Sequence, residues 1–208
     1  MTSSSDPLDL EDLPPSASEV RELRDPRTLR AITHPVRLAL LEVLALDGPL
    51  TATQAGELIG ESPTTCSFHF RQLAKYGFVE EAGPGPGRQR PWRLRHLGMS
   101  FSDVSEDPEL SVAARSLERM VFDRALDRLH HFHDVKSSFP VEWQVASESG
   151  ENVLFVTPDE LSGVLHDVVA VLDRFRDRIE NPETRPEGSL PVEVLVFAYP
   201  IRTPGGRP

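Results

Sequence analysis

Cysteine, lysine and long apolar runs are scarce in this 208-residue chain. Because Cys66 is the single cysteine, an internal disulfide and a multi-cysteine zinc cluster are excluded. The longest aliphatic runs hold about five residues, as at 168–172, whereas a membrane-spanning helix needs about 20. The first residues also lack the basic and apolar segments of a secretory signal. These absences predict a cytoplasmic protein that has no disulfide and makes no contact with a membrane.

Positive charge is scarce over the chain as a whole. It carries 22 Lys and Arg against 33 Asp and Glu, a formal net charge of −11. This balance argues against a histone-like protein that binds nucleic acid over its whole surface. The charge is uneven, however, because residues 27–97 hold nine basic and six acidic residues between acidic flanks. A mildly basic block of this kind indicates a local surface for a polyanion.

The patterns that usually accompany catalysis or phosphate binding are missing as well. No Gly-x-Ser-x-Gly occurs, and neither His34 nor His69 has a Ser or Asp at the spacing of a triad. The loop at 83–87 lacks the Lys-Ser/Thr of a phosphate loop. The C-terminal part shows no paired carboxylates and no nucleophile. We therefore expect no enzyme activity, no catalytic residue and no cofactor.

Composition and hydrophobic periodicity divide the chain into three predicted parts. Residues 1–25, rich in Ser, Pro, Asp and Glu, predict a disordered acidic tail. Residues 26–97 predict a domain of short helices that ends in a β-hairpin. Residues 98–208 predict a long helix followed by a small α+β domain. The expected fold class is therefore α+β and mainly helical.

Helix-breaking residues separate the short helices of residues 26–97. Pro35 lacks an N–H, so the first helix should kink or begin anew there. Gly60 makes a tight turn, after which Ser62 is a good N-cap and Pro63 suits the first helical position. The predicted elements are helices over 27–46, 50–59 and 63–76, and strands over 78–82 and 91–97.

Longer amphipathic patterns alternate with apolar runs beyond residue 97. Thr157 and Glu160 have the spacing of a capping box, which marks a helix start. The predicted elements of this part are helices over 109–136 and 157–179, and strands over 141–147, 152–157 and 191–201.

Helix, turn and helix followed by a basic hairpin is the arrangement of a winged helix-turn-helix. Its two helices must cross closely, which the small Gly56 allows. Its turn needs a residue that tolerates positive φ, which Gly60 supplies. An apolar residue must anchor the following helix, and Cys66 holds that position. For this cysteine, packing in the core is therefore favoured over a role as a redox sensor.

The outward face of the helix over 63–76 would enter the major groove of DNA. Hydroxyl groups near the helix N-terminus suit phosphates and base edges. Arg71 can pair with guanine or phosphate, and Phe68 can touch a thymine methyl group. Lys75 is expected to meet the DNA backbone, and the wing over 83–91 is expected at the minor groove. The residues predicted to contact DNA are Ser62, Thr64, Thr65, Ser67, Phe68, Arg71, Gln72, Lys75, Arg88 and Arg90.

Residues 28–95 closely resemble the winged-helix transcriptional regulators of the ArsR-like superfamily. The resemblance rests on the corner His34-Pro-Val-Arg, the run Ser67-Phe-His-Phe-Arg-Gln-Leu and the run Tyr76-Gly-Phe-Val-Glu. It implies a homodimer in which each recognition helix reads half of an inverted-repeat operator in double-stranded DNA. It also implies that the added segment 98–201 serves dimerisation or sensing. An unidentified small-molecule effector is left open.

The chain departs from the metal-sensing branches of that superfamily. One branch has a Cys-x-Cys near the helix that carries the turn, and this chain has none. Another combines an Asp-x-His with a His-x-x-Glu/His in a terminal helix. Residues 130–134 hold three His and one Asp, but Leu117 and Arg119 stand at the matching upstream positions and cannot bind metal. We therefore expect no metal site.

The leading hypothesis is a homodimeric, sequence-specific DNA-binding regulator that acts as a repressor. The alternative is a winged-helix protein-docking module without DNA binding. The basic recognition face argues against docking, which would favour apolar anchors. Titration of salt against duplex binding distinguishes the two, because phosphate contacts weaken as salt rises.

Overall fold

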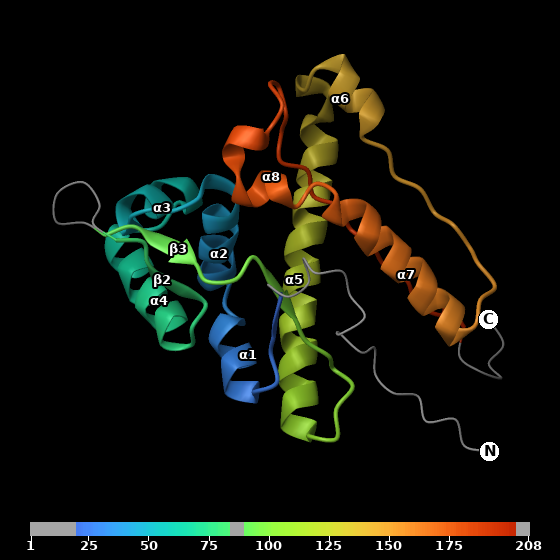
Figure 1. The fold of residues 1–208 in the computed structure, drawn as a ribbon, viewed down its shortest axis with the longest axis horizontal. Helices are drawn as coiled ribbons and strands as arrows, with labels where there is room; N and C mark the ends of the chain where they lie inside the picture. Colours follow the sequence, from blue (N-terminus) through green and yellow to red (C-terminus); the bar gives the residue numbers. More distant parts are fainter. Residues whose placement is uncertain (1–19, 84–89, 203–208) are drawn as a thin grey trace. The chain divides into compact units, whose positions relative to one another are not determined.

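The structure is a computed structural model of the 208-residue chain and describes residues 20–83 and 90–202 (Figure 1). The chain divides into two compact units, Met1–His131 and Phe132–Pro208. Each unit is described by itself below. Most of the predicted tail, residues 1–19, lies outside the described residues.

The first unit contains the predicted short helices and hairpin. The helix expected over 27–46 is divided in two, because Pro35 begins a new helix as predicted. The following helix, turn and helix lie within two residues of the predicted bounds. The elements are α1 (Pro26–Ile32), α2 (Pro35–Asp47), α3 (Ala52–Ile59), α4 (Pro63–Lys75), β2 (Val79–Glu81) and β3 (Trp92–Leu94).

A side chain at the N-cap fixes the start of each of these four helices. Thr51 forms a full capping box with Gln54 at the start of α3, and the hydroxyl of Ser62 accepts from the backbone N–H of Thr65 at the start of α4. At α2 the cap is His34, whose ring nitrogen accepts from the N–H of Val36. Such caps satisfy backbone donors that the helix itself leaves free.

Ordered structure begins earlier than the predicted end of the tail at residue 25. Strand β1 (Val20–Glu22) pairs in parallel with β4 (Gly98–Ser100), with Val20 opposite Gly98. Leu23, which follows β1, is buried in the core. The expectation of disorder over 20–25 is therefore wrong. Strand β1 is ordered because it pairs with β4, a segment far away in the sequence. Local composition carries no information about such a distant pairing.

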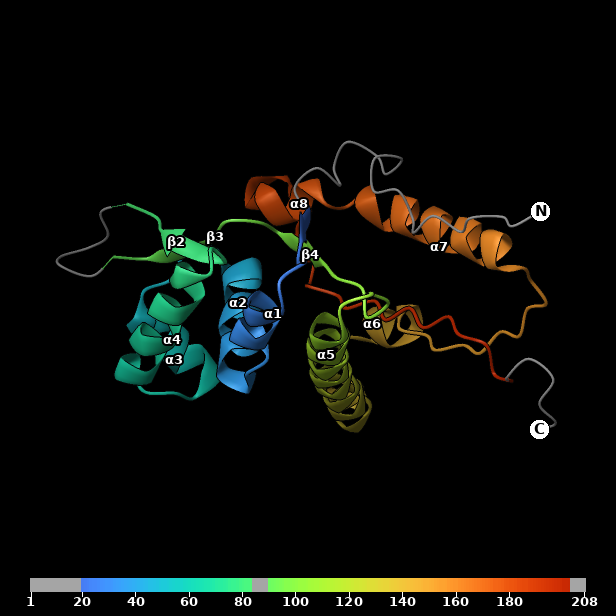
Figure 2. The same cartoon turned by 90° about the horizontal axis from the view of Figure 1, so that it is seen from below.

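The core of the first unit also extends past residue 97, where the sequence analysis ended the domain. Helix α5 (Pro108–Val135) begins one residue before its predicted start and lies beside α1 and α2 (Figures 1 and 2). Its first turns contribute Ala113, Ala114 and Leu117 to the same core cluster as the short helices. Farther along, Arg124 and Arg128 of α5 pair with Glu42 of α2 at 2.8 and 3.1 Å. The long helix therefore starts as part of the first unit.

The hairpin is joined to the helices through its returning strand. Strands β2 and β3 are antiparallel, with Val79 opposite Leu94 and Glu81 opposite Trp92. The backbone of Trp92 also exchanges two hydrogen bonds with Leu50, which precedes α3. The indole stacks on Phe70 of α4, with ring centroids 5.5 Å apart. Trp92 is therefore the apolar base of the hairpin.

The second unit is helical in the part that the structure describes. Its elements are the 3₁₀ helix η3 (Lys136–Ser138), α6 (Val141–Ala146), α7 (Pro158–Asp173), α8 (Asp177–Glu180) and the 3₁₀ helix η4 (Pro182–Thr184). The predicted capping box at Thr157 is present and opens α7. That helix ends at Asp173, not at 179 as predicted, and a short further helix follows.

The three strands predicted for this region are wrong. Residues 141–146 form α6, and residues 152–157 and 191–201 contain no strand. Apolar alternation favours a strand only where a partner strand satisfies its backbone. No described residue between 132 and 202 is buried, so these runs have no core to face, and they form no strand among the described residues. The fold class is still α+β and mainly helical, and every strand among the described residues belongs to the first unit.

None of the helices within 20–83 and 90–202 is both long and apolar enough to cross a membrane.

The contact between α3 and α4 depends on Gly56. A Cβ at this position would lie 2.5 Å from the carbonyl oxygen of Glu61, which belongs to the backbone of the turn. Gly60 closes the same turn at a φ of 73°, in the left-handed region, and the N–H of Glu61 donates to the carbonyl of Gly56. Cys66 of α4 is fully buried behind the turn. All three predicted roles in the turn are confirmed.

Replacing Gly56 with alanine should therefore destabilise the first unit, although alanine is ordinarily the better helix former. We expect a loss of about 1–3 kcal/mol in the free energy of unfolding, the usual cost of overpacking. Urea unfolding followed by circular dichroism measures it. Gly163→Ala is the matched control, because no atom lies within 4 Å of a Cβ there. A Gly56→Ala protein as stable as the wild type would contradict the close crossing.

Candidate nucleic-acid interface

The outward face of α4 carries most of the residues that the sequence assigned to DNA. Thr64, Phe68, Arg71 and Lys75 are exposed, and Phe68 shows 50% of its surface. The remaining three of this helix, Thr65, Ser67 and Gln72, are half-buried. The opposite face is buried in the core through Cys66, His69, Phe70 and Leu73. The helix thus has one face fixed by packing and one polar face available to a ligand.

Two of the predicted hydroxyl groups have a structural role at the start of α4. The oxygen of Ser62 accepts from the backbone N–H of Thr65 at 3.0 Å, and the two side-chain oxygens are 2.8 Å apart. Thr64 and Ser67 carry no such bond within the described residues. They are therefore the hydroxyl groups of this helix that are free to bind a phosphate oxygen or a base edge.

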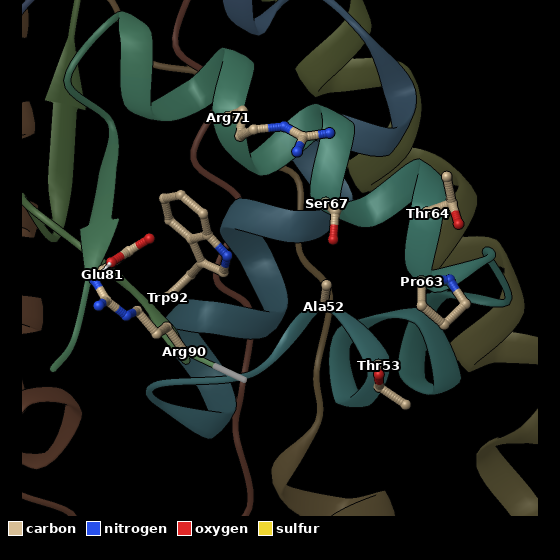
Figure 3. Close-up of a pocket in the computed structure, with 9 residues that line it drawn as sticks. All are labelled: Ala52, Thr53, Pro63, Thr64, Ser67, Arg71, Glu81, Arg90 and Trp92. Atoms are coloured by element: carbon tan, nitrogen blue, oxygen red, sulfur yellow. Dashed lines mark hydrogen bonds and ion pairs between the residues drawn. The ribbon is translucent and has the colours of Figure 1, made fainter. Parts of the chain in front are cut away.

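A hollow of about 540 Å³ lies between α4, the start of α3 and the hairpin (Figure 3). Helix α4 contributes Thr64, Ser67 and Arg71 to its wall. Thr53 comes from the first turn of α3, where backbone N–H groups give a helix its partial positive charge. The structure therefore brings the recognition face together with a second helix start, which the sequence analysis did not include in the site.

The charges of the hairpin are largely paired with each other. Arg90 bonds Glu81 at 2.6 Å, and Arg93 bonds Glu80 at 2.7 Å. Arg95 also lies 3.4 Å from Glu80. The carboxylate beside Arg90 raises the pKa of that guanidinium, which stays charged. These exposed pairs are weak, but a phosphate at the wing must compete with them.

Arg71 differs from the hairpin arginines because no carboxylate among the described residues pairs with it. Lys75 packs its ammonium 5.7 Å from the centre of the Tyr76 ring. The other predicted wing residue, Arg88, lies outside the described residues, together with the rest of 84–89. Within the described residues, Arg71 is therefore a cation of this face without a carboxylate partner, and it is available to an anion.

A polar cluster behind α4 holds the recognition helix in place, and the sequence analysis missed its central residue. Arg37 of α2 donates from Nε to Nδ1 of His69 at 3.3 Å and from Nη1 to the carbonyl oxygen of Ala31. The rings of His34 and His69 lie 4.6 Å apart. One guanidinium thus connects α1, α2 and α4. The signal was present in the His34-Pro-Val-Arg run, which was quoted for its resemblance alone.

The hydrogen bonds of this cluster require both histidines to be neutral. In each ring Nδ1 accepts a hydrogen bond, from Val36 N–H in His34 and from Arg37 in His69. Burial lowers the pKa of His69, and the neighbouring His34 and Arg37 lower it further, whereas Glu61 opposes the shift. Burial and Arg37 likewise lower the pKa of His34, again against Glu61. Protonation of Nδ1 in either ring would place a new N–H directly against the N–H group from which that nitrogen now accepts.

The other reactive side chains of the sequence do not form a site here. Cys66 is fully buried, and burial raises the pKa of its thiol, so the reactive thiolate is disfavoured. Within 20–83 and 90–202, no three or more His, Cys, Asp or Glu side chains are grouped in a way that could hold a metal ion.

Comparison with known proteins agrees with this geometry. Residues 32–82 match a family model described as a helix-turn-helix domain. A similar solved structure is an NMR structure from Mycobacterium bovis, described as a homodimeric winged helix-turn-helix DNA-binding domain of a possible ArsR-family transcriptional regulator. It is 20% identical, covers 51% of this chain and 81% of its own, and superposes with a TM-score of 0.31. Comparison with curated proteins gives no match.

The fold and the family match identify residues 32–82 as a helix-turn-helix domain, a class of fold whose second helix can enter the major groove of DNA. The family match covers the turn and both of its helices. It confirms the helix-turn-helix on which the resemblance to ArsR-like regulators rests.

The neutral histidine pair predicts a stability that depends on pH. The folded state holds His34 and His69 below their ordinary pKa of about 6.5. Their contribution is therefore complete above about pH 6.5 and is lost as the pH falls from there toward the lower folded values, because the unfolded state then binds more protons. We expect urea midpoints to fall between pH 7.5 and pH 5.

His69→Gln should reduce this pH dependence. His131→Gln, at an exposed position of α5, is the matched control and should leave the dependence unchanged. Equal slopes for wild type and His69→Gln would show that the cluster does not titrate in this way.

Proposed function

We propose that this protein is a sequence-specific transcriptional repressor that binds an inverted-repeat operator as a homodimer. The observation that carries the proposal is the polar face of α4, which is held rigid from behind and presents Arg71, an arginine that no carboxylate among the described residues pairs with. A helix of this kind fits the major groove and places its N-terminal residues against base edges. As a cytoplasmic protein it would have access to DNA.

The major-groove contacts would be divided between bases and phosphates. Arg71 has the reach and the planar donors to bond the edge of a guanine. Thr64 and Thr53, at the starts of α4 and α3, would take phosphate oxygens from the two sides of the hollow. Phe68, half exposed, would lie against a thymine methyl group. Lys75 and Gln72, farther along α4, would meet the DNA backbone.

The hairpin would serve as the wing at the minor groove, with Arg88 and Arg90 as its cations. The ion pair of Arg90 with Glu81 supports this role, since it holds the guanidinium at the edge of the same hollow as Arg71. On binding, a phosphate would replace the carboxylate as the partner of Arg90. Such contacts add affinity with little sequence preference.

Dimerisation is supported by apolar surface outside the DNA-binding face. Val164, Val171 and Phe175 share one side of α7 and its end, and they expose 40, 53 and 49% of their surfaces. Apolar residues at spacings of three and four are typical of a helix that packs against another helix. A second copy of this chain would bury them. The same two-fold symmetry would place two α4 helices on one inverted repeat.

Selection of bound duplexes from a random pool tests the proposal. We expect the selected sequences to contain an inverted repeat whose half-sites are spaced by about one helical turn, roughly 10 base pairs. Binding should weaken steeply with added salt. The absence of duplex binding even at low salt would contradict the proposal and favour the protein-docking alternative.

Arg71→Ala should remove most of the preference for the selected operator over unrelated duplex. Loss of a bidentate contact to a base costs about 1–3 kcal/mol, and each 1.4 kcal/mol is a factor of ten. Lys75→Ala should instead weaken all duplexes by similar factors and lower the salt slope by about one. Gel shifts with specific and unrelated duplexes measure both effects.

Arg119→Ala is the control for this pair of variants, because it removes an equal charge from an exposed position on α5. It should bind both duplexes like the wild type. If Arg71→Ala weakened specific and unrelated duplexes by the same factor, Arg71 would not read a base.

A further inference from the structure

The first unit contains a second cavity, on the side of α2 away from the recognition helix α4. Its volume is about 230 Å³, and it is a partly open cavity lined by residues of β1, α2, the hairpin and the segment 96–99, which reaches into β4. Most of its wall is apolar. The apolar residues that line it are Leu38, Leu41, Ala45, Phe78, Leu94, Leu97 and Met99. A space of this kind suits a small ligand with an apolar body.

One guanidinium stands in this apolar wall with a nitrogen left unpartnered. Arg21 of β1 lies over the ring of Phe78, with its guanidinium carbon 4.6 Å from the ring centre. Its Nη1 is buried and has no hydrogen-bond partner among the described residues. A buried donor without a partner costs free energy, and a charged one costs more than a neutral one. Because Nη1 is itself buried, an anionic group in the cavity would pair with the other nitrogens of Arg21, which lines the wall.

A second arginine adds to the positive charge at this point. A Cβ built at Gly77 would lie 3.5 Å from Nη1 of Arg21 and 3.5 Å from Nη1 of Arg95. The two guanidiniums therefore approach each other around one glycine. Burial lowers the pKa of Arg21, and repulsion from Arg95 lowers it further. A nearby negative charge would oppose this lowering, because it favours the charged form of the guanidinium.

The other polar residues of the cavity do not cancel this charge. Glu42 lies in the wall, but its carboxylate is already bound by Arg124 and Arg128 at 2.8 and 3.1 Å. His96 is exposed, and Arg95 has Glu80 as a partner only at 3.4 Å. The cavity is therefore apolar along most of its wall and cationic at one end.

We propose that this cavity binds a small monocarboxylate with an apolar chain, whose carboxylate pairs with Arg21 while the chain lies between α2 and the hairpin. The volume corresponds to roughly eight groups of the size of a water molecule, at about 30 Å³ each. A linear acid of six carbons, with its two oxygens, has that number of heavy atoms. Arg21 supplies the charge, and Leu41, Ala45 and Phe78 supply the apolar contacts.

The position of this site suggests a consequence for DNA binding, which rests on the function proposed above. Phe78 and Leu94 belong to the base of the hairpin, and Glu42 connects α2 with α5. A ligand in the cavity would thus touch the wing from behind. The cavity would then be an effector site within the DNA-binding unit itself. The sequence analysis had instead given a possible sensing role to the segment 98–201.

Calorimetric titration of the full chain with hexanoate tests the site without any DNA. We expect saturable binding of one hexanoate per chain, and at least tenfold weaker binding of 1-hexanol and hexylamine, which have the same chain without the negative charge. Arg21→Met keeps an apolar stem and should weaken hexanoate binding at least tenfold. Arg27→Met removes an exposed arginine of α1 outside the cavity and should bind hexanoate like the wild type.

A second pair of variants keeps the test decisive if Arg21→Met does not fold. Ala45→Phe fills the cavity and should abolish hexanoate binding. Leu46→Phe adds a ring at the neighbouring, exposed position of α2 and should leave binding intact. The proposal is overturned if the wild type shows no saturable binding, if hexanol binds as tightly as hexanoate, or if Ala45→Phe binds like the wild type. Because no duplex is present, such a failure is distinct from a failure to bind DNA.

Discussion

The close crossing of α3 and α4 is the constraint on which the DNA-binding unit depends. The two helices can approach only because Gly56 has no side chain where the backbone of Glu61 passes. Once they are this close, Cys66 and Phe70 are sealed in the core and the opposite face of α4 is turned outward. Packing on one side of a short helix thus decides which residues the other side can offer. A recognition helix needs this rigidity, because base contacts depend on fixed geometry.

The support behind α4 is polar as well as apolar. Arg37 holds His69 and the end of α1 together, so one charged group in a half-buried position takes the place of several apolar contacts. Such a group is stable only while its partners accept hydrogen bonds. The surface in front shows the opposite arrangement, since Arg71 has no ionic partner among the described residues. The structural guanidinium of Arg37 therefore has its hydrogen-bond partners within the fold, whereas the guanidinium of Arg71 remains for a ligand.

The two cavities of the first unit have different chemistry although both contain arginine. The hollow in front of α4 is larger and more polar, with Thr64, Ser67 and Arg71 spaced along one side of it, as suits a hydrated polyanion. The cavity behind the hairpin is smaller and apolar, with Arg21 at one end, as suits a small amphipathic anion. The hairpin contributes to both through Trp92 in front and Leu94 behind. It is the element that could connect occupation of one with occupation of the other.

The sequence by itself determined the helices, the turn and the outward residues of α4, because caps, helix breakers and periodicity act over a few residues. Only the tertiary structure decided the pairing of β1 with β4, the entry of α5 into the core and the salt bridges of the hairpin. These join segments far apart in the chain, on which local patterns have no bearing. The same reason explains the error at 191–201, where an apolar run looks like a strand but pairs with no strand among the described residues.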